Sequence, residues 1–191
     1  MKTSFTPNLY VALIHYPVVN KEGDIIAAAV TNLDLHDISR ASKTYGVKRF
    51  YVVTPLKDQK ALVCRIRHHW VQGAGARYNP NRREAMELVA VADSLKEVVD
   101  EIGRNNGRHP KTVVTSARSG TRKLGFITLR EMIATGTPCV LIFGTAWGLS
   151  ESVLSAADYT LEPIRGYCGY NHLSVRSAAA IVLDRLLGSN Q

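Results

Sequence analysis

The sequence has only three cysteines, Cys64, Cys139 and Cys168, and no two of them form a CxxC pair. An odd and scattered set argues against a disulfide framework and predicts reduced thiols. The chain also lacks an apolar run of about 18 residues, which a membrane-spanning helix needs, so we expect no membrane association. Its N-terminal residues lack the continuous apolar region and the cleavage site of a signal peptide. We therefore expect a cytoplasmic location.

Two common kinds of ligand site are missing as well. The sequence contains no G-x-G-x-x-G turn and no glycine-rich loop followed by a Walker lysine, which argues against an ordinary nucleotide-binding α/β enzyme. The adjacent histidines His68 and His69 point away from each other on a helix, and no second ligand pair follows them. We predict no metal site.

The whole chain has a net charge of +8, and acidic residues are scarce in two parts of it. Residues 57–83 and 102–130 are basic, and the acidic stretch 84–101 separates them. This polarised distribution favours a polyanionic partner such as RNA, and the alternative is a basic face that keeps the protein soluble. The predicted RNA contacts are Arg65, Arg67, Arg82, Arg83, Arg118, Arg122 and Lys123. Trp70 either stacks on a base beside them or belongs to the core.

The order of the elements predicts an α/β fold with a mostly parallel sheet and helices on both faces. A chain of 191 residues fits one domain, 1–191, with a basic helical elaboration at about 57–83. Expected strands are 9–15, 49–54, 112–116, 139–143 and 159–161. Expected helices are 34–45, 57–73, 94–102 capped by Ser94, 128–134 capped by Thr128, and 174–180, with loops at 73–81 and 119–124.

Two glycine-bearing loops follow short apolar strands. The strand 139–143 opens into Gly144–Gly148, and the strand 159–161 opens into the loop 163–170. We expect the two strands to be neighbours and their loops to form a slot lined by backbone, because glycine lets a main chain approach a flat ligand closely. The carboxyl ends of strands are where open α/β sheets bind ligands. We therefore expect Gly144→Val to fill the slot.

The same segments carry three motifs in order. Phe143-Gly144 and Gly148-Leu149-Ser150 bracket the first, Glu162 to Gly166 fills the second, and Tyr170 to Ser174 falls at the third. Upstream, Arg40 is followed by Gly46-Val47. From about Asp34 to Leu187 the chain thus resembles the SPOUT (α/β-knot) RNA methyltransferases, in particular the ribose-methylating SpoU branch. It departs from that branch in lacking the glutamate of the first motif and in having His172 and Asp34 where asparagine is usual. It is similar to bacterial SPOUT domains that sometimes occur joined to a tRNA guanine-N1 methyltransferase.

The resemblance implies a C-terminal trefoil knot, a homodimer and S-adenosylmethionine as cofactor. The residues it places at the cofactor are Thr115, Ser116, Gly144, Thr145, Gly148, Leu149, Leu161, Ile164, Gly166, Tyr167, Asn171 and Leu173. The residues it places at the reaction are Arg40, Asp37 and Ser174. Arg40 would stabilise an alkoxide-like oxygen and grip phosphate, and its alternative role is an ion pair with Asp34 or Asp37. Ser174 either touches the methyl acceptor or caps the last helix.

The implied function is methyl transfer from S-adenosylmethionine to structured RNA, tRNA or rRNA, at a ribose 2′-oxygen or a base nitrogen. A carboxylate or histidine would suit a nitrogen acceptor as a base, because guanine N1 is a stronger acid than a ribose hydroxyl. The alternative is an accessory RNA-binding module without catalysis. A tRNA-modifying enzyme is a further partner that the resemblance suggests.

Overall fold

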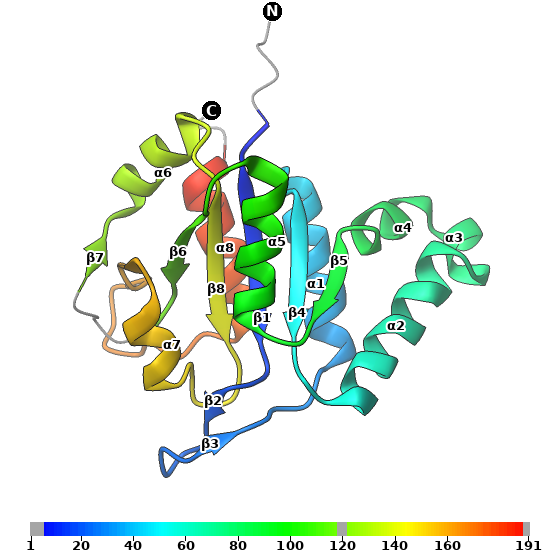
Figure 1. The fold of residues 1–191 in the computed structure, drawn as a ribbon, viewed down its shortest axis with the longest axis horizontal. Coiled ribbons are helices and arrows are strands. Elements are labelled where there is room, and N and C mark those ends of the chain that lie inside the picture. Colours follow the sequence, from blue (N-terminus) through cyan, green and yellow to red (C-terminus); the bar gives the residue numbers. More distant parts are fainter. Residues whose placement is uncertain (1–5, 118–121, 189–191) are drawn as a thin grey trace, which may run out of the picture.

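The computed structural model describes residues 6–117 and 122–188, which build one parallel sheet. Its strand order is β5-β4-β1-β8-β6-β9-β7, and every neighbouring pair is parallel. The strands are β1 (Leu9–Ile14), β4 (Arg49–Val53), β5 (Val89–Ala92), β6 (Lys111–Val114), β7 (Lys123–Leu124), β8 (Cys139–Gly144) and β9 (Tyr159–Leu161). A separate antiparallel ribbon, β2 (Val18–Val19) and β3 (Ile25–Ile26), lies at the carboxyl edge of the sheet (Figure 1).

Helices cover both faces of the sheet, as the alternation of elements predicted (Figure 1). Leu9, Val11 and Leu13 of β1 pack into one core cluster, and the alternate residues of the same strand pack into a second cluster on the other face. The first cluster includes residues of α1 (Asn32–Thr44), α2 (Lys57–Val71), α4 (Pro80–Met86), α6 (Phe126–Ala134) and α8 (Val175–Leu187). The second includes residues of α5 (Leu95–Asn106) and α7 (Glu151–Ala156). None of the described helices is long and apolar enough to cross a membrane.

A hydroxyl cap explains where α5 begins. Ser94 Oγ accepts a hydrogen bond from the backbone N–H of Glu97 at 3.2 Å, which confirms the predicted start of α5. The Glu97 carboxylate accepts from the N–H of Asp93 at 2.7 Å, one residue before the position that a capping box would use. The helix ends at Gly107, whose φ of 68° is in the left-handed region.

Residues 73–81 are not the loop that their glycines and proline predicted. The structure has α3 (Ala74–Tyr78) there, and α4 begins directly after it at Pro80. The Asn79 side chain accepts from the N–H of Arg82 at 2.9 Å, and proline is well suited to the first turn of a helix. Asn79 and Pro80 therefore start a helix instead of breaking one.

Two other local predictions were also wrong. Helix α6 begins at Phe126, so Thr128 is not its cap; the N–H of Phe126 donates to Glu162 Oε1 at 2.9 Å, a partner distant in sequence. Of the expected loop at 119–124, Lys123–Leu124 forms β7 and pairs with β9, and residues 118–121 lie outside the described part of the chain. Within α2, Val63 is fully buried and Leu62 is 36% exposed.

Candidate active site

The carboxyl ends of β8, β6 and β9 bring three loops to one edge of the sheet, at the bottom of Figure 1. Strand β6 lies between β8 and β9, so the prediction that the two glycine-bearing strands are neighbours was wrong. The loop after β6 fills the middle position. Thr115 Oγ1 donates to the carbonyl of Ile142 at 3.1 Å, and Asn171 Nδ2 donates to the carbonyl of Ala117 at 3.3 Å. The edge is therefore built from three connected loops.

The first glycine loop is held rigidly against the ribbon formed by β2 and β3. Trp147 N–H donates to Val19 O at 3.1 Å, Val19 N–H donates to Gly148 O at 3.0 Å, and Thr145 Oγ1 donates to Ile14 O at 2.9 Å. A Cβ on Gly144 would lie 2.8 Å from the backbone nitrogen of Leu149. A side chain at position 144 would thus collide with the loop's own backbone before it filled any slot, which corrects the reason we gave for Gly144→Val.

The loop between β9 and α8 is open. Among the hydrogen bonds between described residues, none joins the backbone of residues 163–173 to other backbone. A Cβ on Gly166 would meet no atom within 4 Å, and the side chains of Tyr167, Tyr170 and Leu173 are exposed. The segment consequently offers N–H and C=O groups beside apolar surface, and of its carbonyls that of Tyr170 accepts from Cys168 Sγ at 4.0 Å.

The twelve predicted cofactor residues all lie on these three loops or at the strand ends that lead into them. Leu149 and Leu161 are 6% and 2% exposed, and Ile164 packs against the core. Leu161 can therefore offer a ligand little besides its backbone. Thr115, Ser116 and Thr145 lie one or two residues beyond β6 and β8.

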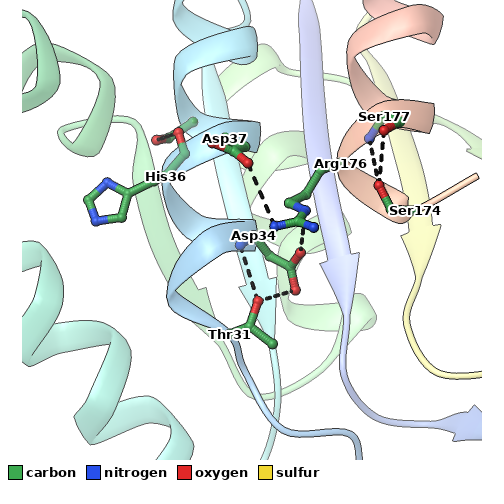
Figure 2. A network of polar contacts seen from close by, with 8 residues as sticks. Thr31, Asp34, His36, Asp37, Ser174, Arg176 and Ser177 are labelled. Atoms are coloured by element: carbon green, nitrogen blue, oxygen red, sulfur yellow. Dashed lines mark hydrogen bonds and ion pairs between the residues drawn. The ribbon is translucent and has the colours of Figure 1, made fainter.

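An ion-pair network joins α1 to the first turn of α8 (Figure 2). Arg176 Nε lies 3.6 Å from Asp34 Oδ1, and a terminal guanidinium nitrogen lies 3.8 Å from Asp37 Oδ2. Both carboxylates that we considered as partners of Arg40 thus face Arg176. Arg40 is exposed on α1 and has no ion pair among the residues described. Sequence reasoning missed Arg176. The feature that could have pointed to it is a single charged residue among the small residues at the start of α8.

Ser174 acts as the N-cap of α8. Its Oγ accepts from the N–H of Ser177 at 3.2 Å and lies 3.0 Å from the Ser177 hydroxyl (Figure 2). Capping was one of the two predicted roles, and it is the one that the geometry supports.

Comparison with known proteins identifies the family. The sequence model of a family described as SAM-dependent RNA methyltransferases matches residues 8–188. The chain belongs to this family. It is 47% identical over 181 residues to a tRNA (guanine-N(1)-)-methyltransferase of Oleidesulfovibrio alaskensis, covering 95% of this chain and 42% of that protein. It is 38% identical over 185 residues to an uncharacterized protein of Aquifex aeolicus, covering 96% of this chain and 90% of that one.

Solved structures agree on the fold. A probable methylase family protein from Haemophilus influenzae superimposes with a TM-score of 0.62 at 20% identity, covering 95% of this chain and 66% of that one. The SpoU methyltransferase AviRb from Streptomyces viridochromogenes, in complex with AdoMet, gives 0.58 at 19% identity, covering 95% of this chain and 57% of that one. The resemblance to SPOUT methyltransferases and the α/β fold class are thereby confirmed. The trefoil knot stays a prediction.

S-adenosylmethionine is the cofactor of an RNA methyltransferase of this family, and the three loops fit such a ligand. Adenine needs close backbone donors and acceptors with apolar walls. Residues 163–173 form no backbone–backbone hydrogen bond among the described residues, and the same segment carries the apolar side chains of Ile164 and Leu173. The Gly166 backbone is open on the side where a Cβ would stand. These residues would hold the adenosine part of the cofactor.

The predicted RNA contacts divide by their environment. Arg65, Arg122 and Lys123 are exposed, and Arg122 donates to the carbonyl of Ala157 at 3.2 Å. Arg83 is paired with Glu87 at 3.0 Å. Arg118 lies outside the described residues. Trp70 packs against the core, with the Arg82 guanidinium 4.6 Å from the centroid of its ring. The core role of Trp70, one of its two predicted roles, is the one that the structure supports.

Proposed function

We propose that this chain binds S-adenosylmethionine at the loops that follow β6, β8 and β9, and transfers its methyl group to tRNA. The observation that carries the proposal is the convergence of these three loops, with the backbone of residues 163–173 unpaired, in a chain of the SAM-dependent RNA methyltransferase family. The two methyltransferase relatives are named for tRNA, and this chain spans 42% of the length of each. Since tRNA is the proposed substrate, the cytoplasm is the proposed location.

When bound, S-adenosylmethionine supplies a methyl group already activated by a sulfonium. The protein has to align the methyl acceptor, exclude water and favour loss of the acceptor proton. The cofactor contacts that we propose are the twelve residues predicted from the sequence, with backbone contacts from Leu161 to Tyr167. Gly144 shapes its loop and would contact the ligand only through backbone.

Arg40 is the proposed residue at the methyl acceptor. Its exposed guanidinium, unpaired among the described residues, is free to face an anionic oxygen of the RNA. An arginine is a poor base because its guanidinium stays protonated at physiological pH, so its role is electrostatic. Asp37 faces Arg176 and would act through that network, and Ser174 would fix the start of α8.

A homodimer is part of the proposal. Several large apolar side chains are exposed near the carboxyl edge of the sheet: Ile25, Leu33, Trp147, Tyr167, Tyr170 and Leu173. In a twofold dimer the same patch of each subunit covers the other, so the partner's Arg40 would approach this subunit's cofactor. We further propose that the whole chain forms one methyltransferase domain, with α2, α3 and α4 as its RNA-binding elaboration.

A second candidate function rests on the relatives. Since the matched region is less than half of the two tRNA methyltransferases, their activity can reside in the remainder, and this chain would then be an accessory RNA-binding module that works with a tRNA-modifying enzyme. The Aquifex aeolicus relative is almost fully spanned by this chain, which favours a unit that works by itself.

One experiment decides between the two. Tritiated methyl transfer from S-adenosylmethionine would be measured with unfractionated tRNA and with rRNA from a deletion strain, followed by mass spectrometry of the nucleosides. Transfer to tRNA supports the enzyme, and the methylated nucleoside distinguishes a ribose 2′-oxygen from a base nitrogen. Tight tRNA binding without transfer supports the accessory module. Transfer to rRNA alone would refute the proposed substrate.

A further inference from the structure

Three helices meet around the indole ring of Trp70 in α2. The Arg82 guanidinium of α4 lies over the ring at 4.6 Å, and the imidazoles of His36 and His69 meet the ring edge-on at 5.3 Å and 5.0 Å. Gly75 of α3 makes room for this arrangement, because a Cβ there would lie 2.6 Å from a carbon of the indole. Trp70 therefore fixes where Arg82 and His36 lie.

Arg67 of α2 and Arg82 of α4 differ from nearby basic residues in having no acidic partner among the described residues. Lys43 pairs with Glu84 at 3.1 Å, and the next arginine along α4, Arg83, pairs with Glu87. No ion pair is found for Arg67 or Arg82 within the part of the chain that the structure describes, and the Nε atoms of both are buried without a hydrogen-bond acceptor. Their positive charge is therefore not neutralised by the protein.

His36 connects this cluster to Arg40. Burial lowers the pKa of His36, the charges of Arg82 and Arg40 lower it further, and Asp37 opposes them. His36 thus lies within the electrostatic reach of two arginines, one on α4 and one on its own helix, with His69 and Trp70 of α2 beside it. The Nδ1 atom of His36 is also buried without a partner among the described residues. Residues four apart on a helix lie on the same face, so an anion bound beside His36 would lie on the face of α1 that carries Arg40.

We propose that Trp70 holds Arg82 and His36 as a binding site for one backbone phosphate of the RNA substrate, on the surface shared by α1 and α4. The choice of RNA as the ligand rests on the proposed function. A guanidinium can donate two parallel hydrogen bonds to a phosphate, and stacking on an indole fixes its plane. Trp70 contributes by position and not by stacking on a base, since Arg82 covers its ring and the core covers the rest.

An RNA phosphate fits this surface better than a small free anion. The basic stretch 57–83 runs through all three helices of the elaboration, so the cluster is one point on an extended basic surface. A polyanion gains from such a surface through release of counterions, which a free phosphate ion does not. Inorganic phosphate serves as the comparison ligand: competition by millimolar phosphate at constant ionic strength would show a small-anion site and overturn the assignment to RNA.

The test measures binding of unfractionated tRNA to the full chain by fluorescence anisotropy at several salt concentrations. Arg82→Gln is expected to weaken binding and to flatten the log–log salt dependence by roughly 0.7–0.9. Its matched control is Lys96→Gln on α5, outside the elaboration, whose partner is Asp100. Equal effects of the two substitutions would overturn the proposal.

Trp70 provides the second arm. Trp70→Leu removes no charge but frees Arg82, so tRNA affinity is expected to fall, and adding Arg82→Gln to it should cost little more. Trp70→Phe keeps an aromatic ring under Arg82 and is expected to keep the tRNA affinity. It also gives a folded comparison if Trp70→Leu folds poorly. Full additivity of Arg82→Gln with Trp70→Leu would contradict the positioning role, and so would a loss of tRNA affinity in Trp70→Phe as large as that in Trp70→Leu.

A nuclear magnetic resonance titration of His36 gives a readout that a purely structural role would not move. Added tRNA is expected to raise the pKa of His36, because a nearby phosphate favours the imidazolium; an unchanged pKa would count against the site.

Affinity for S-adenosylmethionine should be the same in all variants. Failure to bind this cofactor at all would refute the proposed function, whereas unchanged tRNA binding by Arg82→Gln would refute only the present inference.

Discussion

Arg176 of α8 and Asp34 of α1 are paired, with 3.6 Å between Nε and Oδ1. Asp34 is only 12% exposed as a side chain, and its other carboxylate oxygen accepts from the Thr31 hydroxyl at 2.6 Å. Thr31 Oγ1 in turn caps α1 by accepting from the N–H of Asp34 at 3.2 Å. The start of α1, which carries Arg40, is therefore linked to the start of α8, which follows the third motif (Figure 2).

Arg176→Met tests the strength of this connection. Methionine keeps an aliphatic side chain and removes the charge, which leaves the Asp34 carboxylate with the Thr31 hydroxyl. We expect the free energy of unfolding at pH 7 to fall by about 1 kcal/mol, the upper end for partly exposed pairs, as measured by urea denaturation. The double-mutant cycle with Asp34→Asn isolates the pair. Additive losses in the two single variants would show that Arg176 and Asp34 do not interact.

Gly166→Ala separates ligand contact from loop geometry. A Cβ on Gly166 meets no atom, so stability should change by less than about 0.5 kcal/mol. If the backbone of Gly166 lies against the cofactor, the added methyl should weaken S-adenosylmethionine binding by about tenfold or more, equivalent to about 1.4 kcal/mol. Calorimetry measures the affinity and thermal unfolding measures the stability.

Two other glycines serve as controls for Gly166. Gly169, in the same loop and equally open, should tolerate alanine with little effect on affinity. Gly144→Ala should instead destabilise the protein by about 1–3 kcal/mol, because its Cβ would overlap the Leu149 backbone. Equal loss of affinity at positions 166 and 169 would mean that the loop as a whole, and not Gly166, governs binding.

Features set by short-range chemistry could be predicted from the sequence. Ser94 and Ser174 cap helices because a hydroxyl accepts from an N–H only three residues away. The strands 139–143 and 159–161 were predicted nearly at their observed bounds, since buried strands are continuous apolar runs. The motif order was sufficient to predict the family and its cofactor.

Features set by contacts distant in sequence could not be predicted. The position of β6 between β8 and β9 depends on how the crossovers place whole strands, which a single apolar run does not encode. Helix α6 starts at Phe126 because Glu162 accepts its N–H from the end of β9. Likewise, Asp34 and Asp37 face Arg176, which lies on the last helix of the fold.

Arg40→Ala tests the proposed electrostatic role at the methyl acceptor. Loss of a contact made in the transition state should lower the rate of methyl transfer by about 100- to 1000-fold. Stability and S-adenosylmethionine affinity should stay nearly unchanged, because Arg40 is exposed and no described residue forms an ion pair with it. The matched control is Lys43→Ala on the same helix, which removes a pair with Glu84. Undiminished transfer by Arg40→Ala would leave Asp37 and His172 as the next candidates.

His15 makes stability depend on pH. It is fully buried at the end of β1. Burial lowers the pKa of His15 below its ordinary value of 6.5, although the charge of Asp34 and hydrogen bonds with the backbone of Ala28 and Ala29 oppose this. The unfolded state therefore binds a proton at a higher pH than the folded state does. Stability should be fully present above pH 6.5 and should fall as the pH drops below it, by at most about 1.4 kcal/mol per pH unit for one proton.

His15→Phe removes this titration while keeping a ring in the core. Urea denaturation between pH 7.5 and 5 should show a shallower loss of stability for His15→Phe than for the unaltered protein, whatever its stability at pH 7.5. His36, whose pKa is also lowered by burial, adds a loss of the same sign, so His36→Gln should flatten the dependence further. His68→Gln, at an exposed position of α2, is the matched control. A slope unchanged by His15→Phe would mean that His15 is protonated as readily in the folded protein as in the unfolded chain, against the effect of its burial.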